Sequence, residues 1–428
     1  GRSRGKSDEG RERGESRVCG QWGRASRAAV VVRVVLVYLA RPLAMRIGLV
    51  DISKGHKSHA GEVPLIGGIA MFCGFLFAAL TLDISLTDFR SFFAAAGLLV
   101  VVGVLDDFHE LSTRARFIAQ IIAALLMAMW GGMVLWDFGD LSFVGIIELG
   151  MFAVPITVFC TVGVINALNM SDGLDGLAGG LCSVTLAAMA YLAWQANRLD
   201  DLHVLLVLLA AVVGFLVLNV RTPWRKRAGV FMGDAGSMFL GFALAWFVIS
   251  FSQGTERYMA PVTALWFLLV PLFDTVGIIL RRIILKKSPF GADREHLHHL
   301  LLAAGFSVNQ ALVIIVCVAV VAMGFGLYAL QAGWSEIGQF IAFMGLFAVY
   351  FGVMMRCWSK GCLFARSLNP FIHERRAGAE RRQIPLKASW VGKPRRVQGF
   401  DRRQIPGHLV ETDKAQRNDK ERVDSRLQ

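Results

Sequence analysis

The chain has 428 residues, of which 55% are hydrophobic and only 18% are charged. Soluble domains are closer to half apolar and a quarter charged, so this composition argues against an ordinary soluble protein. The formal net charge of +13 is also typical of nucleic-acid-binding proteins. Here, however, the basic residues lie between long apolar runs, where they more often set membrane topology. We therefore expect no nucleic-acid partner.

Apolar runs follow one another along the chain, and most are long enough to cross a bilayer core of about 30 Å. Because lipid offers no hydrogen-bond partners to the backbone, each run is expected to be an α-helix. The first run is interrupted by Arg33 and Arg41, and the third is short. The expected spans are 28–46, 64–82, 91–105, 115–136, 149–168, 176–196, 202–219, 236–252, 258–280, 310–329 and 334–355. The predicted fold is all-α, a polytopic transmembrane helical bundle of about eleven spans.

Two basic segments flank the predicted transmembrane domain at 28–355. Residues 1–27 are rich in Arg, Gly and Ser, and they are interpreted as a disordered extension or as a start assigned too early. Residues 356–428 are basic and have little periodic apolar content. This composition predicts a disordered cytoplasmic tail.

Basic residues are distributed unequally between alternate loops. Twelve Lys and Arg residues lie in the loops on one side, and only three lie in the loops on the other side. The basic side comprises loops 51–63, 106–114, 169–175, 220–235 and 281–309. By the positive-inside rule, these loops are predicted to face the cytoplasm.

Carboxylates occur in several of these cytoplasmic loops. Asp106 and Asp107 end a predicted helix, either as solvated cap residues or as functional groups. Since neighbouring residues on a helix point about 100° apart, the two are expected to serve different partners. Asp172 and Asp175 are three residues apart, so at a helix start they would share one face. The glycines around them would suit helix packing, but ionisable groups at membrane helices are costly and usually functional.

Asp234 and a histidine segment complete the polar groups on this side. Asp234 lies between two glycines just before a span, where it could hold a hard cation such as Mg²⁺. Three histidines follow Arg294 within a short segment: His296, His298 and His299. They are interpreted either as a phosphate-binding group or as a structural cluster. Carboxylates, imidazoles and basic residues around a polyanion favour phosphoryl transfer, which depends mostly on positioning and charge stabilisation.

Five motifs occur in order on the cytoplasmic side. They are PLIGG at 64–68, LDD at 105–107, NALNMSDGLDGLAGG at 166–180, VFMGDAGS at 230–237 and SPFGADREHLHHLLLAAGFS at 288–307. With these motifs, the chain resembles the polyprenyl-phosphate N-acetylhexosamine-1-phosphate transferases over about residues 46–310. Within that family, PLIGG and HLHH look like the branch of the undecaprenyl-phosphate N-acetylglucosamine-1-phosphate transferases, which starts O-antigen and similar polysaccharides.

The resemblance implies a role for each matching residue. It implies catalytic roles for Asp106, Asp107, Asp175, His296, His298 and His299. It implies substrate binding by Asn169, Asp172, Phe231 and Arg294, with Phe231 stacked on uracil, and metal binding by Asp234. One departure concerns the acidic motif, which in the family is often DDxxD, whereas its fifth position here is Glu110.

The resemblance also implies the reaction and its setting. The expected donor is UDP-N-acetylglucosamine, the acceptor is undecaprenyl phosphate, and the cofactor is Mg²⁺, with Mn²⁺ as a substitute. UMP is released, by direct attack of the lipid phosphate or through an acyl-phosphate on Asp106 or Asp107. The expected location is the bacterial inner membrane, with the active site facing the cytoplasm, and a homodimer is compatible with the pattern.

Two alternatives remain open on the sequence. One is the same reaction with another UDP-N-acetylhexosamine. The other is a membrane transporter, which would place ionisable groups near the middle of its spans. The polar groups here gather at one membrane face, with Asp274 inside the predicted span 258–280 as the exception.

Overall fold

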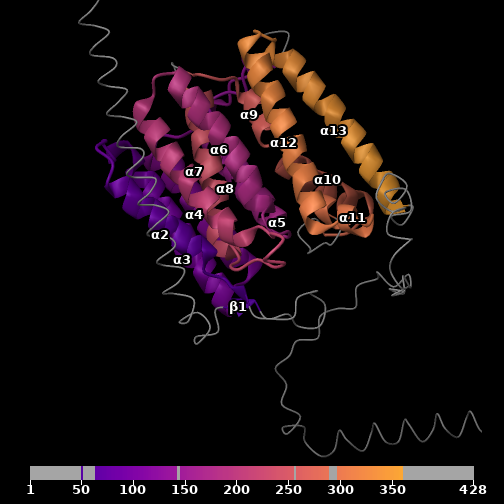
Figure 1. The fold of residues 1–428 in the computed structure, drawn as a ribbon. Helices are drawn as coiled ribbons and strands as arrows, with labels where there is room; N and C mark the ends of the chain where they lie inside the picture. Colours follow the sequence, from indigo (N-terminus) through magenta and orange to yellow (C-terminus); the bar gives the residue numbers. More distant parts are fainter. Residues whose placement is uncertain (1–49, 52–62, 142–144, 255–256, 289–295, 360–428) are drawn as a thin grey trace, which may run out of the picture. The chain divides into compact units, whose positions relative to one another are not determined.

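The computed structural model describes residues 50–51, 63–141, 145–254, 257–288 and 296–359, which form the helical bundle in Figure 1. The helices of the bundle are α2 (Gly67–Leu80), α3 (Arg90–His109), α4 (Thr113–Leu125), α5 (Ala153–Ser171), α6 (Leu177–Gln195), α7 (Leu199–Asn219), α8 (Gly233–Ser252), α9 (Pro261–Phe267), α10 (Leu269–Ile284), α11 (Leu297–Ala303), α12 (Val308–Gln331) and α13 (Glu336–Ser359). The predicted span 28–46 and the segment 1–27 lie outside the described residues, as does the predicted tail beyond the end of α13.

The other regular elements are short. A π-helical turn, Leu126–Trp130, continues α4, and the two-residue strands β1 (Val50–Asp51) and β2 (Val63–Pro64) pair antiparallel. Eight helices in the described part of the chain are long and apolar enough to cross a membrane, or nine spans if α9 and α10 are counted as one. The prediction of an all-helical, polytopic membrane protein is therefore confirmed.

Helix α8 forms the centre of the bundle and packs against α2, α3 and α5 (Figure 1). Its large side chains, such as Phe239, Phe242 and Trp246, are almost fully buried. Close approach to its neighbours depends on glycines: a Cβ built on Gly103 of α3 would lie 2.3 Å from the Cα of Ala235. Thus α8, which carries Asp234 in its first turn, is enclosed by the helices that carry the other sequence motifs.

The predicted span 258–280 consists of two helices instead of one. Helices α9 and α10 are bent by 85° at Leu268. Pro271 has no N–H to donate to the carbonyl of Phe267, one turn earlier in a helix. That carbonyl instead accepts a hydrogen bond from Thr185 Oγ1 at 2.9 Å. The proline therefore explains the break. The prediction of one continuous helix over 258–280 is wrong.

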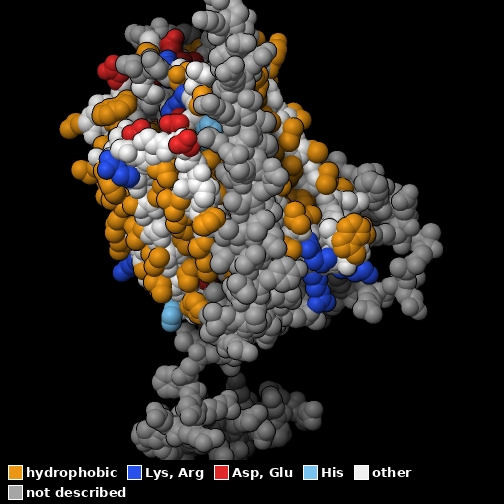
Figure 2. Space-filling model, turned by 60° about the vertical axis from the view of Figure 1, so that its left-hand side comes forward, with side chains coloured by type: hydrophobic (Ala, Val, Ile, Leu, Met, Phe, Trp, Pro, Cys, Tyr) orange, Lys and Arg blue, Asp and Glu red, His pale blue; other side chains and the backbone are white. Residues whose placement is uncertain are grey.

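Apolar side chains cover much of the bundle surface. Helices α12 and α13 have few buried residues and expose many aliphatic ones, as expected for helices in contact with lipid. In Figure 2, hydrophobic side chains dominate the described surface between the two ends of the visible face, and Lys, Arg, Asp and Glu gather towards these ends. This distribution agrees with a protein that crosses a membrane several times.

Candidate active site

Carboxylates from three separate elements meet at one end of the bundle. Asp106 and Asp107 lie in the last turn of α3, Asp172 directly follows α5, and Asp234 lies in the first turn of α8. The backbone N–H of Asp234 donates to Oδ1 of Asp107 at 3.1 Å. The tertiary structure therefore brings together four of the acidic residues predicted from the sequence.

The loop before α8 is fixed by the PLIGG segment. The backbone N–H groups of Gly67 and Gly68 donate to the carbonyls of Phe231 and Met232 at 2.9 and 3.0 Å. Gly233 has a φ of +69°, and a Cβ built there would lie 2.5 Å from Oδ2 of Asp107. Glycine is thus required at this turn both for its conformation and for the approach of Asp107.

Arg116 provides positive charge inside the acidic cluster. Its Nη1 lies 3.0 Å from Oδ2 of Asp106 and 3.7 Å from Oδ2 of Asp234. On the other side, Nδ2 of Asn169 donates to Oδ1 of Asp234 at 2.6 Å and contacts Oγ of Ser237 at 2.8 Å. Asp234 is therefore held between a guanidinium and an amide.

The two adjacent aspartates of α3 have different hydrogen-bond partners within the protein. Asp106 accepts hydrogen bonds from Arg116 and from the backbone N–H of Leu111, the latter at 2.7 Å. Asp107 faces the start of α8, and its Oδ2 is buried without a hydrogen-bond partner among the described residues. Such a buried, unpaired oxygen is unusual and requires an explanation.

Asp172 lies in an unfavourable environment for a negative charge. Burial raises the pKa of its carboxyl well above the usual range, and the nearby charges of Asp234, Asp107 and Asp175 raise it further. Like charges in one site disfavour ionisation of all of them together. The cluster is therefore suited to positive groups that enter from outside the protein.

The acidic cluster fits a divalent cation. Within the described ranges, no three His, Cys, Asp or Glu side chains enclose a metal site by themselves. Mg²⁺ does not need such a cage, because it is usually held by one or two carboxylates together with water and substrate phosphates. The free Oδ2 of Asp107 and the carboxylate of Asp234 match that donor set.

Asp175 has a different hydrogen-bonding environment from Asp172. We predicted that these residues would share a helix face, but α5 ends at Ser171 and α6 begins only at Leu177. Gly176, with a φ of +87°, lies in the turn between the helices. Asp172 faces the acidic cluster, whereas Oδ2 of Asp175 accepts from Nε of Arg221 at 2.6 Å.

The histidine segment packs against the same turn. The rings of His296 and His298 are nearly parallel, at 7° and with centroids 5.7 Å apart, and His299 lies beside His298. A Cβ built on Gly173 would lie 2.5 Å from Nε2 of His298, which has no hydrogen-bond partner among the described residues. Burial lowers the pKa of His298 to about 3, and the nearby His299 contributes to this shift. The ring of His298 is therefore neutral at pH 7.

Of the remaining predicted substrate-binding residues, the structure describes Phe231 but not Arg294. Phe231 is partly buried directly before α8 and is tied to Pro64 through its backbone N–H at 3.0 Å. Arg294 lies outside the described residues. Glu110, at the fifth position of the acidic motif, is exposed and has a left-handed φ of 48°.

Several residues of the site were missed in the sequence. They are Arg116, Asn219, Arg221, Asp274 and Tyr350. Asn219 accepts from the N–H of Gly176 at 2.6 Å and donates to the carbonyl of Val230 at 2.9 Å, which joins two motif loops. A polar residue at the end of an apolar span was the available signal for Asn219. No local pattern connects Arg116 with Asp234.

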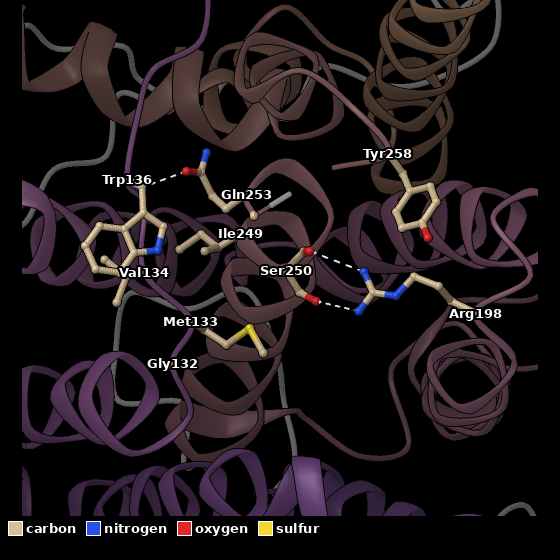
Figure 3. Close-up of a pocket in the computed structure, with 10 residues that line it drawn as sticks. Gly132, Met133, Val134, Trp136, Arg198, Ile249, Ser250, Gln253 and Tyr258 are labelled. Atoms are coloured by element: carbon tan, nitrogen blue, oxygen red, sulfur yellow. Dashed lines mark hydrogen bonds between the residues drawn. The ribbon is translucent and has the colours of Figure 1, made fainter. Parts of the chain in front are cut away.

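A separate cavity of about 410 Å³ lies near the other end of α8 (Figure 3). Ser250, in its lining, is about 24 Å along the helix axis from Asp234 at 1.5 Å per residue. In this cavity, Arg198 donates to the hydroxyl and carbonyl of Ser250 at 3.0 and 3.2 Å, and it also pairs with Asp201. The cavity is lined by Gly132, Met133, Val134, Trp136, Arg198, Ile249, Ser250, Gln253, Gly254 and Tyr258. It has no acidic lining residue, and we assign it no part in the chemistry.

Comparison with known proteins identifies the family. Residues 89–252 match the model of glycosyl transferase family 4. An undecaprenyl-phosphate alpha-N-acetylglucosaminyl 1-phosphate transferase from Yersinia pestis is 35% identical over 353 residues, which cover 81% of this chain and 94% of the relative. Proteins of the same name from Salmonella typhi and Haemophilus influenzae are 36% and 38% identical, over 76% and 74% of this chain and 88% and 90% of their own lengths.

The chain belongs to glycosyl transferase family 4. This confirms the resemblance to the polyprenyl-phosphate N-acetylhexosamine-1-phosphate transferases, and with it the prediction of a membrane-embedded enzyme. The matched region of the family runs from the start of α3 to the end of α8. It therefore contains all four carboxylates of the acidic cluster.

Proposed function

We propose that this family 4 enzyme transfers N-acetylglucosamine 1-phosphate from UDP-N-acetylglucosamine to undecaprenyl phosphate. The observation that carries the proposal is the convergence of Asp106, Asp107, Asp172 and Asp234, with Arg116 beside Asp106 and Asp234 and with His298 against the adjoining turn. A cluster of this kind suits two phosphate-bearing substrates, whose mutual repulsion is the main barrier to their reaction. The names of the relatives support the same sugar and the same lipid.

The reaction exchanges one phosphoanhydride bond for another. An oxygen of the lipid phosphate attacks the β-phosphorus of the nucleotide sugar, and the bond from that phosphorus to the bridging oxygen breaks. UMP leaves with that oxygen. A phosphate monoester has a second pKa near 6, so the attacking group is already mostly ionised at pH 7. We therefore favour direct attack over a two-step route through an acyl-phosphate on Asp106 or Asp107.

Four residues at the cluster have a proposed task. Asp234 and the free oxygen of Asp107 would hold Mg²⁺, which neutralises charge on the phosphates when it is bound. Arg116 keeps Asp106 and Asp234 together and can also approach a phosphate oxygen. Asn169 orients Asp234 through its 2.6 Å hydrogen bond.

The orientation of the enzyme follows from its loop charges. The loops that carry the acidic cluster and the histidines are the basic ones, which predicts a cytoplasmic active site. The transporter alternative relied on Asp274 as an ionisable group within a span. Asp274 instead pairs with His296 of the histidine segment, at 2.8 Å, which gives it a place beside the proposed site.

Release of UMP by the purified protein tests this proposal. We expect release only when UDP-N-acetylglucosamine, undecaprenyl phosphate and Mg²⁺ are all present, and no release when the lipid is omitted. A panel of UDP-sugars tests the choice of N-acetylhexosamine. Vesicles that take up the UDP-sugar without forming UMP would support a transporter and contradict the proposal.

A further inference from the structure

Asp274 is a buried carboxylate to which the sequence motifs assign no role. It lies on α10, shortly after the bend at Leu268, and only 6% of it is exposed. Its Oδ2 lies 2.8 Å from Nδ1 of His296. Its Oδ1 accepts from the backbone N–H of Leu297 at 2.8 Å and from the hydroxyl of Tyr350 at 3.3 Å. Since a carboxylate only accepts hydrogen bonds, the proton of its pair with His296 lies on Nδ1.

The interactions of Asp274 lead towards the acidic cluster. His296 stacks in parallel on His298, and Nε2 of His298 points at the backbone of Gly173. Gly173 directly follows Asp172, whose carboxyl is influenced by Asp107 and Asp234. Two imidazole rings therefore lie between Asp274 and the acidic cluster.

Helix α13 holds the histidine segment from a second direction. Tyr350 belongs to α13, and Met354 and Cys357 of the same helix pack against Leu300 and Ala304, at the end of α11. The seven-residue helix α11 is thus fixed at its start by Asp274 and along its length by α13. Alone, such a short helix would be unstable in water, so these contacts decide where its histidines lie.

We propose that Asp274 is a positioning residue of the transfer reaction, which holds His296 with its proton on Nδ1 and its Nε2 directed to the substrate diphosphate. Tyr350 supports this role by fixing the second oxygen of the carboxylate. The inference rests on the proposed function, because the diphosphate that His296 would contact belongs to the nucleotide sugar proposed above. Outer partners that orient a metal-ligating imidazole typically change metal affinity or activity about 10- to 100-fold when they are removed, and we expect a change of that size here.

A double-mutant cycle between Asp274 and His296 tests the proposal. Asp274→Asn keeps the size of the side chain but can present an N–H to Nδ1, which favours the wrong tautomer. We expect kcat for UMP release to fall about 10- to 100-fold, with KM for the UDP-sugar within about threefold of the wild type. If Asp274 acts through His296, Asp274→Asn should cause no further loss in a His296→Gln background. Asp200→Asn, at an exposed position of α7, is the matched control and should behave as the wild type.

Tyr350→Phe provides a second cycle if Asp274→Asn fails to fold. We expect a loss of about threefold in the wild-type background and none in the His296→Gln background, because the 3.3 Å hydrogen bond is the longest of the three. Tyr328→Phe, at an exposed position of α12, controls for loss of a hydroxyl. If the wild-type enzyme is active but the loss of kcat in either double variant equals the product of the losses in its two single variants, the positioning role is overturned. A wild-type protein that releases no UMP from any UDP-sugar would overturn both the proposed function and this inference.

Discussion

At the scale of single residues, the acidic cluster shows how position decides the role of chemically identical groups. Asp106 and Asp107 are neighbours in sequence, yet one pairs with Arg116 and the other leaves a buried oxygen unpaired. Asp234 is the carboxylate that contacts both sides of the cluster, through Arg116 at 3.7 Å and through its own N–H to Asp107. The charge of Asp234 should therefore matter more than its volume.

We predict that Asp234→Asn abolishes UMP release with little loss of folding. Asn keeps the size and the backbone N–H of residue 234 but removes the negative charge that would hold a divalent cation. The measurement is the Mg²⁺ dependence of turnover for Asp→Asn variants at 106, 107, 172 and 234. A metal ligand variant should need much more Mg²⁺, whereas a variant that only positions substrate should keep its midpoint. A near wild-type rate at an unchanged midpoint for Asp234→Asn would show that the metal assignment is wrong.

At the scale of helices, the contact between α3 and α8 brings the cluster together. Gly103 lies one turn before Asp107, and its α-carbon faces the backbone of Ala235. Small residues at such crossings allow membrane helices to approach closely. The 3.1 Å hydrogen bond from Asp234 to Asp107 depends on this approach.

We predict that Gly103→Ala destabilises the fold by about 1–3 kcal/mol, the usual cost of overpacking, and reduces turnover strongly. Its Cβ would lie 2.3 Å from the Cα of Ala235, so α3 must move away from α8 and separate Asp107 from Asp234. Gly97→Ala in the same helix is the matched control, since its nearest neighbour would be 3.8 Å away. Alanine there should be neutral or stabilising by up to about 1 kcal/mol. Thermal unfolding in detergent and UMP release together measure both effects, and equal behaviour of the two variants would contradict the prediction.

At the scale of the whole molecule, the two ends of the bundle differ in chemistry. One end carries the acidic cluster, the histidines and most of the basic loop residues, and the other carries the Arg198 cavity. Exposed tryptophans occur near both ends, for example Trp136 beside the cavity and Trp224 in a basic loop. Tryptophans are enriched where a membrane protein meets the lipid–water interface.

Cysteine labelling should show that the two ends lie on opposite sides of the membrane. In a protein without its native cysteines, single cysteines at 110 and 226 should react from the cytoplasm, and those at 140 and 200 from the other side. All four positions are exposed in the structure, so access is decided by the membrane alone. Labelling of 110 and 140 from the same side by an impermeant reagent would contradict the proposed topology.

The sequence by itself determined the membrane-spanning helices and most of the acidic residues. Apolar runs predict helices because each residue in lipid must satisfy its backbone locally. Nine of the eleven predicted spans each coincide with one described helix, and a tenth, 258–280, covers the pair α9 and α10. The break at Leu268 was also encoded locally, through Pro271, although the run 258–280 was interpreted as one helix. The adjacent residues Asp106 and Asp107 point in different directions, which could be expected locally because it depends only on helix geometry.

Only the tertiary structure decided how these groups combine. Asp172 and Asp175 were predicted to act on one face, but the turn after Ser171 directs one to the acidic cluster and the other to Arg221. Asp274 and His296 are 22 positions apart and meet only because the start of α11 packs against α10. Such contacts depend on the packing of helices that are distant in sequence, and no local periodicity carries that information.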